Sequence, residues 1–287
     1  MKTNYVNLMQ VSSPEIMGIL NLTEDSFSDG SLYLDKTLAI KRALEMIKEG
    51  AAIIDLGAES TKPGSQPVSE EQELARIIPI LKTLKREHPA VRYSIDTRKA
   101  SVAKATLDCG ADIVNDISAL RYDDKMAETI SNYPKAKLIL MHMQGEPQTM
   151  QNNPHYSEVL SDILAFFKER IDYCISEGIR HENIMLDPGI GFGKNLVHNL
   201  KLLANLDYFN QLGMPLVLGA SRKSFINTIA TTDVSKRIEG SLAAAAWGAM
   251  QGVEVIRCHD VLAHVKFLQV FSAIAKERRI SSVSKED

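Results

Sequence analysis

The chain has few cysteines. Its 287 residues include only Cys109, Cys174 and Cys258, an odd number at wide spacing. Disulfide frameworks and zinc sites use paired or closely spaced cysteines, so neither is indicated. The pattern predicts free thiols, and therefore a protein that works in the reducing cytoplasmic compartment.

Long apolar runs and an excess of one charge are also missing. No stretch approaches the ~18 consecutive apolar residues of a membrane-spanning helix, and the first residues lack the apolar segment of a signal peptide. The 33 basic residues nearly balance the 36 acidic ones, for a net charge of −3. We therefore expect neither a membrane nor a nucleic acid among its partners. Hydrophobic residues make up 45% of the chain, which is enough for a large core.

A dinucleotide-binding fingerprint is absent from the first predicted strand–helix turn. Residues 21–30 read Asn-Leu-Thr-Glu-Asp-Ser-Phe-Ser-Asp-Gly, with no Gly-x-Gly-x-x-Gly. A doubly wound open sheet would be expected to carry that fingerprint at this turn. The sequence therefore disfavours the open sheet.

A repeated unit is present instead. Glycines stand where helices should end, shortly before β-rich apolar runs: Gly50, Gly110, Gly178, Gly213 and Gly252. Eight candidate strands end near Leu20, Leu56, Ile95, Asn115, Met141, Asp187, Gly219 and Arg257. Helical patterns lie between them, one of which begins with a Ser69–Gln72 capping box. A (β/α)8 barrel takes ~250 residues. We therefore predict an α/β protein, a (β/α)8 TIM barrel with a single domain over residues 1–287 and its core at about 14–275.

The loop after the sixth predicted strand is rich in glycine. Residues 187–194 read Asp-Pro-Gly-Ile-Gly-Phe-Gly-Lys, directly after an apolar run. Pro188 ends the strand ladder, and the glycines permit close approach by a ligand. One interpretation is a flat ligand held by Asp187 at its polar edge and by Phe192 at one face. The alternative is a turn with a buried aromatic residue.

Polar residues recur at the carboxyl ends of the predicted strands, where barrel enzymes place their active sites. Asp96, Asn115 and Asp187 offer acceptors that suit the N–H-rich edge of a heterocycle. The last two strands are followed by hydroxyls and cations that suit a phosphate: Ser221, Arg222, Lys223, Arg257 and His259. Asn21 is a neutral oxygen ligand that could help to hold Mg²⁺ on that phosphate. The predicted substrate is a flat heterocycle bearing phosphate or diphosphate.

Each of these residues also has a plainer interpretation. Asn115 could be an ordinary turn residue, Asp96 could form a surface ion pair with Arg98, and Lys223 could cap a solvated face. We expect His142 to be a semi-buried histidine at a strand end, and Cys258 to be a small packing residue. The gathering of all the polar residues at one end of eight strands favours a site.

Eight segments in the same order resemble the dihydropteroate synthase family of the pterin-binding barrel superfamily. They are residues 17–30, 57–64, 94–97, 115–118, 141–145, 187–194, 221–224 and 257–260, and the resemblance extends over about residues 14–275. It implies a transferase of folate synthesis that joins 6-hydroxymethyl-7,8-dihydropterin diphosphate to 4-aminobenzoate, releasing diphosphate and 7,8-dihydropteroate. It also implies a homodimer and competition by sulfonamides at the 4-aminobenzoate site.

The resemblance further implies roles for individual residues. The pterin diphosphate would be bound by Thr61, Asp96, Asn115, Asp187, Lys223, Arg257 and His259. Within this set Asp96, Asp187 and Lys223 would be catalytic, and Asn21 would hold Mg²⁺. The 4-aminobenzoate pocket would be formed by Phe27, Thr61, Pro63, Phe192 and Ser224.

Two other readings remain open. A related barrel could pass a methyl group from methyltetrahydrofolate to a corrinoid protein, but the predicted diphosphate site argues against this. A noncatalytic pterin-binding paralogue is the second, and intact Asp96, Lys223 and Arg257 argue against it. The chain also departs from the usual family pattern at Glu24, Ser31 and Lys62, in the first two strand–helix loops. Lysine lacks the planar fork of arginine, so a bidentate contact at Lys62 would be weakened.

Overall fold

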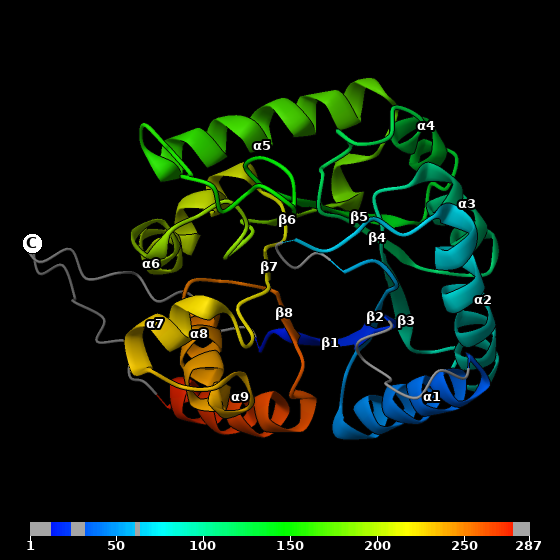
Figure 1. Ribbon diagram of the computed structural model, residues 1–287. Coiled ribbons are helices and arrows are strands. Elements are labelled where there is room, and N and C mark those ends of the chain that lie inside the picture. The colour runs from blue at the N-terminus through cyan, green and yellow to red at the C-terminus, as the bar shows by residue number, and fades with distance from the viewer. Residues whose placement is uncertain (1–12, 24–31, 61–63, 278–287) are drawn as a thin grey trace, which may run out of the picture.

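Eight parallel strands form the centre of the computed structural model, which describes residues 13–23, 32–60 and 64–277 (Figure 1). The strands are β1 (Glu15–Asn21), β2 (Ile53–Gly57), β3 (Arg92–Asp96), β4 (Ile113–Asp116), β5 (Lys137–Met141), β6 (Ile184–Asp187), β7 (Val217–Leu218) and β8 (Val255–Cys258). Their order in the sheet is β6-β5-β4-β3-β2-β1-β8-β7. Each observed end lies within one residue of the predicted end.

The sheet closes on itself between β6 and β7. Leu186 and Leu216 form an isolated parallel bridge, in which the Leu186 N–H donates to the carbonyl of Pro215 at 2.9 Å. This contact is much smaller than the pairing of β1 with β2, where five residue pairs are in register. The closure confirms the predicted (β/α)8 barrel. The predicted core limits of 14 and 275 stay a prediction.

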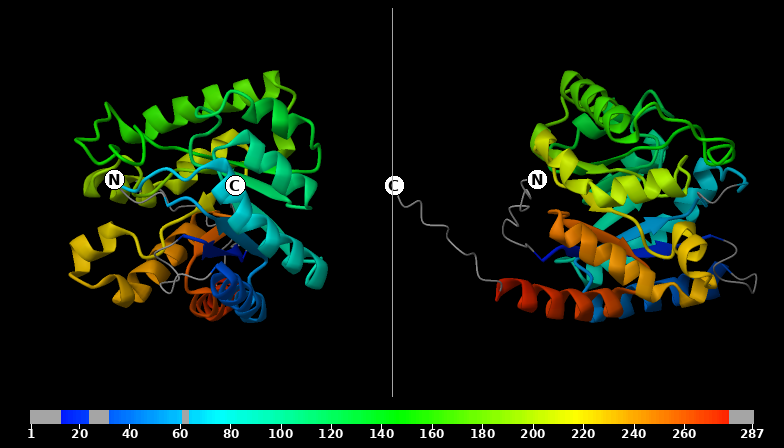
Figure 2. Two further views of the ribbon diagram at one scale, coloured as in Figure 1. Left: turned by 45° about the vertical axis from the view of Figure 1, so that its right-hand side comes forward. Right: turned by 90° about the vertical axis from the view of Figure 1, so that its left-hand side faces the viewer.

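Helices surround the barrel in both side views (Figure 2). In the described ranges they are α1 (Leu32–Glu49), α2 (Glu70–Glu87), α3 (Ala100–Asp108), α4 (Met126–Ser131), α5 (Val159–Ser176), α6 (Leu196–Ala204), α7 (Ser224–Ala230), α8 (Ile238–Met250) and α9 (Val261–Lys276), with 3-10 turns η2 (His181–Asn183), η3 (Leu206–Leu212) and η4 (Val234–Lys236). Ser69 and Gln72 form the predicted capping box of α2. None of the helices in the described part of the chain has the length and apolar character needed to cross a membrane.

Most buried apolar side chains lie in two layers. The larger layer packs the outer faces of the strands against the helices. The smaller one lies inside the barrel and consists of Met17, Ile53, Ile113, Ile139, Val217 and Val255. Because side chains alternate along a strand, the next inward position of each strand lies nearer its carboxyl end. Several of those positions carry polar side chains instead, and they form the base of the site described next.

Candidate active site

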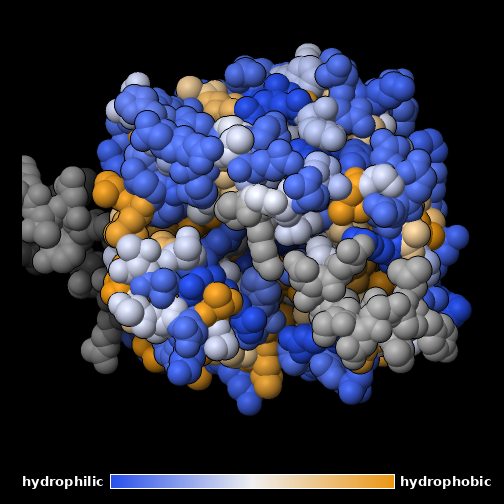
Figure 3. Space-filling model, in the orientation of Figure 1, coloured by the Kyte–Doolittle hydropathy of each residue, from blue (hydrophilic) through white to orange (hydrophobic). Residues whose placement is uncertain are grey.

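Arg257 of β8 lies at the centre of a charged cluster inside the carboxyl end of the barrel. Its Nε donates to Asp55 Oδ2 at 2.6 Å, and its Nη2 donates to Asp96 Oδ2 at 2.7 Å. Asn115 of β4 joins the cluster, since its Nδ2 lies 3.4 Å from the same oxygen of Asp55. The face in Figure 3 is the one onto which these strand ends open, and most of its described surface is hydrophilic.

One guanidinium therefore serves two carboxylates. Asp55 is fully buried, and the side chain of Asp96 is 13% exposed. Burial raises the pKa of Asp96 to about 7; Arg257 opposes this shift and the nearby charge of Asp55 adds to it. Although burial opposes it, the pKa of Arg257 is raised by Asp55 and Asp96. With a pKa of about 7, Asp96 is partly protonated at neutral pH. A ligand with an N–H-rich or positively charged edge would favour its charged form.

Asp187 lies at the end of β6, where Pro188 and Gly189 break the strand. Its Oδ1 accepts the Gly189 N–H at 2.8 Å. Burial raises the pKa of Asp187, and the Gly189 N–H and Lys223 partly offset that effect. Gly189 has a φ of +68°, and a Cβ there would lie 2.0 Å from the carbonyl oxygen of His142. Only glycine fits this position, so the turn that orients Asp187 depends on it.

Phe192 and Lys223 meet beside Asp187. The Lys223 ammonium lies 4.1 Å from the centroid of the Phe192 ring. Burial, together with the charge of Arg257, lowers the pKa of Lys223 to about 8. Phe192 is buried against Met141 and Met143 as the turn alternative expected, but it also lies under Lys223. The alternative in which Lys223 caps a solvated face is wrong. Ser224 is exposed at the start of α7.

Ser221 and His259 lie together after β7 and β8. Ser221 Oγ is 3.2 Å from His259 Nδ1, and it accepts the backbone N–H of His259 at 3.3 Å. Burial, together with the neighbouring cations Arg222 and Arg257, lowers the pKa of His259 to about 4. Arg222 itself is occupied by Asp260, with Nε to Oδ2 at 2.9 Å. This pair ties the seventh and eighth strand–helix loops together.

Asn21 lies exposed at the end of β1. In the described ranges no group of three or more His, Cys, Asp or Glu side chains could hold a metal ion. One amide oxygen is compatible with Mg²⁺, which keeps several waters and is commonly bound through one or two protein ligands and the substrate phosphates. Of the other predicted site residues, Phe27, Thr61 and Pro63 lie outside the described residues, as do Glu24, Ser31 and Lys62.

The structure also corrects the sequence-based expectations. The plainer alternative, a surface ion pair of Asp96 with Arg98, is wrong: Asp96 points into the barrel to Arg257, whereas Arg98 contacts Glu59 and Glu146 outside it. His142 is more buried than expected, at 6% exposure, and its Nδ1 lies 2.9 Å from Lys194 Nζ. Cys258 is fully buried, as expected for a packing residue.

Sequence reasoning missed Asp55 and Lys194. Asp55 is a charged residue within an otherwise apolar strand, two residues after the inward-facing Ile53. Residues two apart in a strand face the same side, so this spacing could have placed Asp55 inside the barrel. Lys194 is 2% exposed and donates to the Phe192 carbonyl at 2.9 Å. Its burial lowers its pKa to about 7. It is the last residue of the glycine-rich stretch, where a lysine would ordinarily be expected in solvent.

Comparison with known proteins places this geometry in a family. A family described as "Pterin binding enzyme" matches residues 17–259. The dihydropteroate synthase of Escherichia coli (strain K12) is 44% identical over 274 residues, covering 94% of this chain and 96% of the relative. A structure of the Yersinia pestis dihydropteroate synthase with a sulfonamide drug complex superposes with a TM-score of 0.87 at 40% identity, covering 93% of this chain and 96% of that one.

A second solved structure is also similar. The Xanthomonas albilineans dihydropteroate synthase with 4-aminobenzoic acid has a TM-score of 0.86 at 36% identity, covering 92% of this chain and 94% of that one. The family match begins within the first barrel strand, ends just after the last, and includes every strand end described above. The chain therefore belongs to the dihydropteroate synthase family of pterin-binding enzymes.

Proposed function

We propose that this enzyme joins 6-hydroxymethyl-7,8-dihydropterin diphosphate to 4-aminobenzoate, releasing diphosphate and 7,8-dihydropteroate. The observation that carries the proposal is the Asp55–Arg257–Asp96 cluster at the carboxyl end of the barrel. It provides buried acceptors for a heterocycle beside a cation for an anionic group. The relatives named above, one with a sulfonamide drug and one with 4-aminobenzoic acid, support the same reaction.

The pterin is assigned to the barrel interior. Asp96, Asn115 and Asp187 present acceptors from three different strands, and Lys223 adds a cation at the ring edge. An N–H group of the pterin ring that is buried without an acceptor costs about 1–3 kcal/mol. The match of these acceptors to the ring N–H groups therefore provides specificity. Departure of diphosphate leaves positive charge on the pterin methylene and ring. The carboxylates of Asp96 and Asp187 stabilise that charge as it develops.

The diphosphate is assigned to Arg257, His259 and Thr61, with Ser221 beside His259. Arg257 keeps its charge because two carboxylates flank it. His259 is neutral at pH 7 in the free enzyme, so it acts as a hydrogen-bonding group until an anion arrives. An arriving anion favours the protonated imidazole and raises that pKa.

Mg²⁺ is proposed as the cofactor, held by Asn21 together with the diphosphate. When bound, the ion neutralises charge on the leaving group. Excess chelator should stop turnover, and added Mg²⁺ should restore it. Full activity in chelator would remove the metal from the proposal.

The second substrate is assigned to the outer part of the site. Phe192 and Ser224 border it in the described residues, and Phe27, Thr61 and Pro63 are assigned to it from the resemblance. The arylamine of 4-aminobenzoate is the nucleophile, so no serine or cysteine nucleophile is needed. The direct test measures diphosphate release from the pterin diphosphate with and without 4-aminobenzoate. Release that does not depend on 4-aminobenzoate would argue against the synthase.

Sulfonamides are proposed as inhibitors because they resemble 4-aminobenzoate. Raising the 4-aminobenzoate concentration should relieve inhibition by sulfamethoxazole, as competition at one pocket requires. Turnover that persists at drug concentrations far above that of 4-aminobenzoate would contradict the proposal and direct attention to Glu24 and Lys62. A cytoplasmic location stays a prediction from the cysteine pattern.

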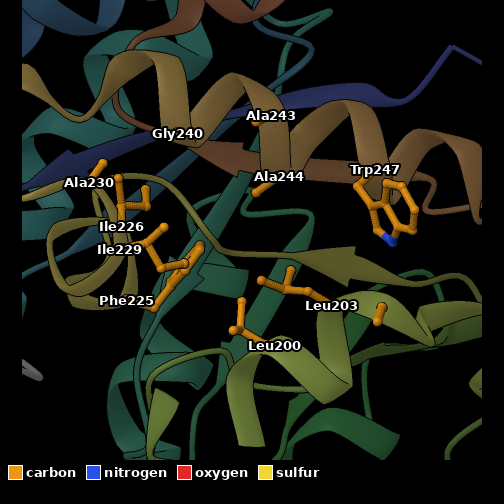
Figure 4. A pocket seen from close by; sticks show the side chains of 11 residues that line it. Leu200, Leu203, Phe225, Ile226, Ile229, Ala230, Gly240, Ala243, Ala244 and Trp247 are labelled. Atoms are coloured by element: carbon orange, nitrogen blue, oxygen red, sulfur yellow. The ribbon is translucent and has the colours of Figure 1, made fainter. Parts of the chain in front are cut away.

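A homodimer is proposed through an apolar groove of about 380 Å³ between α6, α7 and α8 (Figure 4). Leu200 and Leu203 of α6 form one wall, and Trp247 of α8 lies at one end. Trp247 is 49% exposed and Ile229 is 58% exposed. Large apolar side chains exposed together mark interaction surfaces. A second copy of this chain is the proposed occupant, in keeping with the resemblance.

A further inference from the structure

Arg98 connects several loops at the carboxyl end of the barrel. It lies between β3 and α3, and it is 8% exposed. Its Nε and Nη2 lie 3.1 and 2.8 Å from Glu59 Oε1 in the loop after β2. Its Nη1 donates to Glu146 Oε2 at 3.1 Å in the loop after β5. Its guanidinium carbon is 4.0 Å from the centroid of the Tyr122 ring in the loop after β4. One side chain therefore spans three neighbouring loops.

Glu59 connects the two ends of the second strand–helix loop. Its Oε2 accepts the backbone N–H of Val68 at 3.2 Å and a bond from Lys99 Nζ at 2.6 Å. Val68 directly precedes Ser69, the cap of α2. The cations lower the pKa of Glu59 although burial opposes them, so this carboxylate is charged at neutral pH. Its position fixes where the loop leaves β2 and where it enters α2.

A cavity of about 290 Å³ separates the second loop from the fifth. Gln66 and Pro67 line one side, and Pro147 and Gln148 line the other. Arg98 also borders this cavity and bonds to both loops across it. The loops after β2 (cyan) and β5 (green) lie next to each other in the right-hand view of Figure 2.

Lys99 and Arg98 both contact Glu59, but they connect it to different elements. Lys99 lies between Glu59 and Glu73, and all three side chains are at most 10% exposed, so Lys99 holds the second loop to its own helix. Arg98 reaches outward to Glu146, whose side chain is 65% exposed. An ion pair with so exposed a carboxylate adds little stability. The outward contact is therefore better explained by loop placement than by folding energy.

We propose that Arg98 is a positioning residue of the synthase reaction, which holds the second loop against the fifth through Glu59 and Glu146 and thereby sets the affinity for 4-aminobenzoate. The inference rests on the proposed function, because the family resemblance assigns Thr61 and Pro63 of that loop to this substrate. The pterin groups Asp96, Asn115 and Asp187 belong to the strands. Thr61 is also assigned to the pterin diphosphate, but most groups assigned to that substrate lie at the ends of other strands. The affinity for the pterin diphosphate is therefore expected to depend less on the bridge than the affinity for 4-aminobenzoate.

Arg98→Met tests the bridge, because it keeps much of the side-chain volume and removes the charge. The KM for 4-aminobenzoate should rise about fivefold or more, whereas the KM for the pterin diphosphate should rise by a smaller factor and kcat should change less than about twofold. Arg98→Lys keeps the charge but loses the planar fork that reaches two carboxylates. It should therefore restore only part of the affinity.

Glu146→Ala removes the link to the fifth loop alone. It should raise the same KM by a smaller factor, and it should add little when combined with Arg98→Met, because both changes break one connection. Arg92→Met is the matched control. Arg92 pairs with Glu15 at 2.6 Å at the opposite end of the strands, and its loss should change neither KM.

Melting temperatures of all variants accompany the kinetics. Equal rises in both KM values, an unchanged KM for 4-aminobenzoate, or full additivity of Arg98→Met and Glu146→Ala would overturn the proposal. If Arg98→Met does not fold, Arg98→Lys and Glu146→Ala test the proposal by the same comparison. In each variant the KM for 4-aminobenzoate should rise more than the KM for the pterin diphosphate. If the wild-type enzyme releases diphosphate without any dependence on 4-aminobenzoate, or not at all, that result contradicts the proposed function itself. A wild type that turns over normally leaves the Arg98 outcome to be judged separately.

Discussion

Arg257 is placed where a single positive charge must balance several buried carboxylates. Asp55 and Asp96 bond to it directly, and Asp187 is near enough to raise its pKa further. The roles of Asp96 and Arg257 as strand-end residues could be predicted from the sequence, since strand ends in barrels meet at one face. The pairing could not, because Asp55 lies within its strand and is 202 positions away from Arg257.

Asp187→Asn should weaken pterin binding at least several-fold. The amide keeps the shape of the side chain but replaces an acceptor with a donor, which leaves pterin N–H groups facing N–H groups at a cost of about 1–3 kcal/mol. Calorimetric titration with an unphosphorylated pterin measures this directly. Glu182→Gln, a change in an exposed residue just before β6, is the control. Unchanged pterin affinity in Asp187→Asn would remove this residue from the site.

Lys194 makes stability depend on pH. Its folded pKa is about 7, whereas an unfolded lysine has a pKa of about 10.4. Between these values the unfolded chain binds more protons than the folded protein, so stability rises with pH by up to about 1.4 kcal/mol per unit. Below pH 7 both states are protonated and this gain is absent. Wild type should therefore gain stability relative to Lys194→Met between pH 7 and about 10. Urea unfolding at several pH values measures the difference, and parallel curves would contradict the assignment.

At the scale of elements, the strand ends could be predicted well from the sequence because glycines mark the helix ends that come shortly before several strands. Gly50 after α1 and Gly213 after η3 both have positive φ, as predicted for residues that end helices. The loops were harder to predict from sequence. A surface ion pair of Asp96 with Arg98 was one interpretation of the sequence, yet the chain leaves the strand between these residues, so that Asp96 points inward and Arg98 contacts the loops. Side-chain direction after a strand end depends on local backbone that no periodic pattern encodes.

Gly189→Ala should be far more destabilising than Gly213→Ala. Both glycines have φ near +70°, which costs an alanine about 1–2 kcal/mol. At Gly189 the new Cβ would also lie 2.0 Å from a backbone oxygen, whereas at Gly213 no atom lies within 4 Å. Urea unfolding of the two variants separates the shared backbone cost from the clash. Equal losses would show that the β6–α6 turn can shift to relieve the contact.

At the scale of the whole molecule, the groove between α6, α7 and α8 is an open apolar surface. On the face shown in Figure 3, orange residues gather along the left edge, near α6 and α7. The sequence did not predict this surface, because the apolar residues that line it are helical residues of ordinary appearance. Their exposure depends on how three helices are spaced around the barrel.

Trp247→Glu should convert the proposed dimer to a monomer. A charge at the end of an apolar groove loses its hydration on association without gaining a partner. Light scattering on the eluting peak of a gel-filtration column gives the mass directly. Ile274→Glu, at a residue 69% exposed on α9 outside the groove, should leave the mass unchanged. A wild type of monomer mass would contradict the dimer itself.

The barrel is closed between β6 and β7 by a single bridge, so a bound ligand is expected to stabilise the barrel at this seam. Amide hydrogens at this seam are expected to exchange with solvent before those of β1 and β2, because Leu186 and Leu216 form an isolated bridge whereas five pairs join the other two strands. Asp187 follows one edge of the seam and Lys223 follows the other. A ligand that contacts both residues would connect the two edges of the seam. It should therefore slow amide hydrogen exchange at Leu186 more than in β1 or β2.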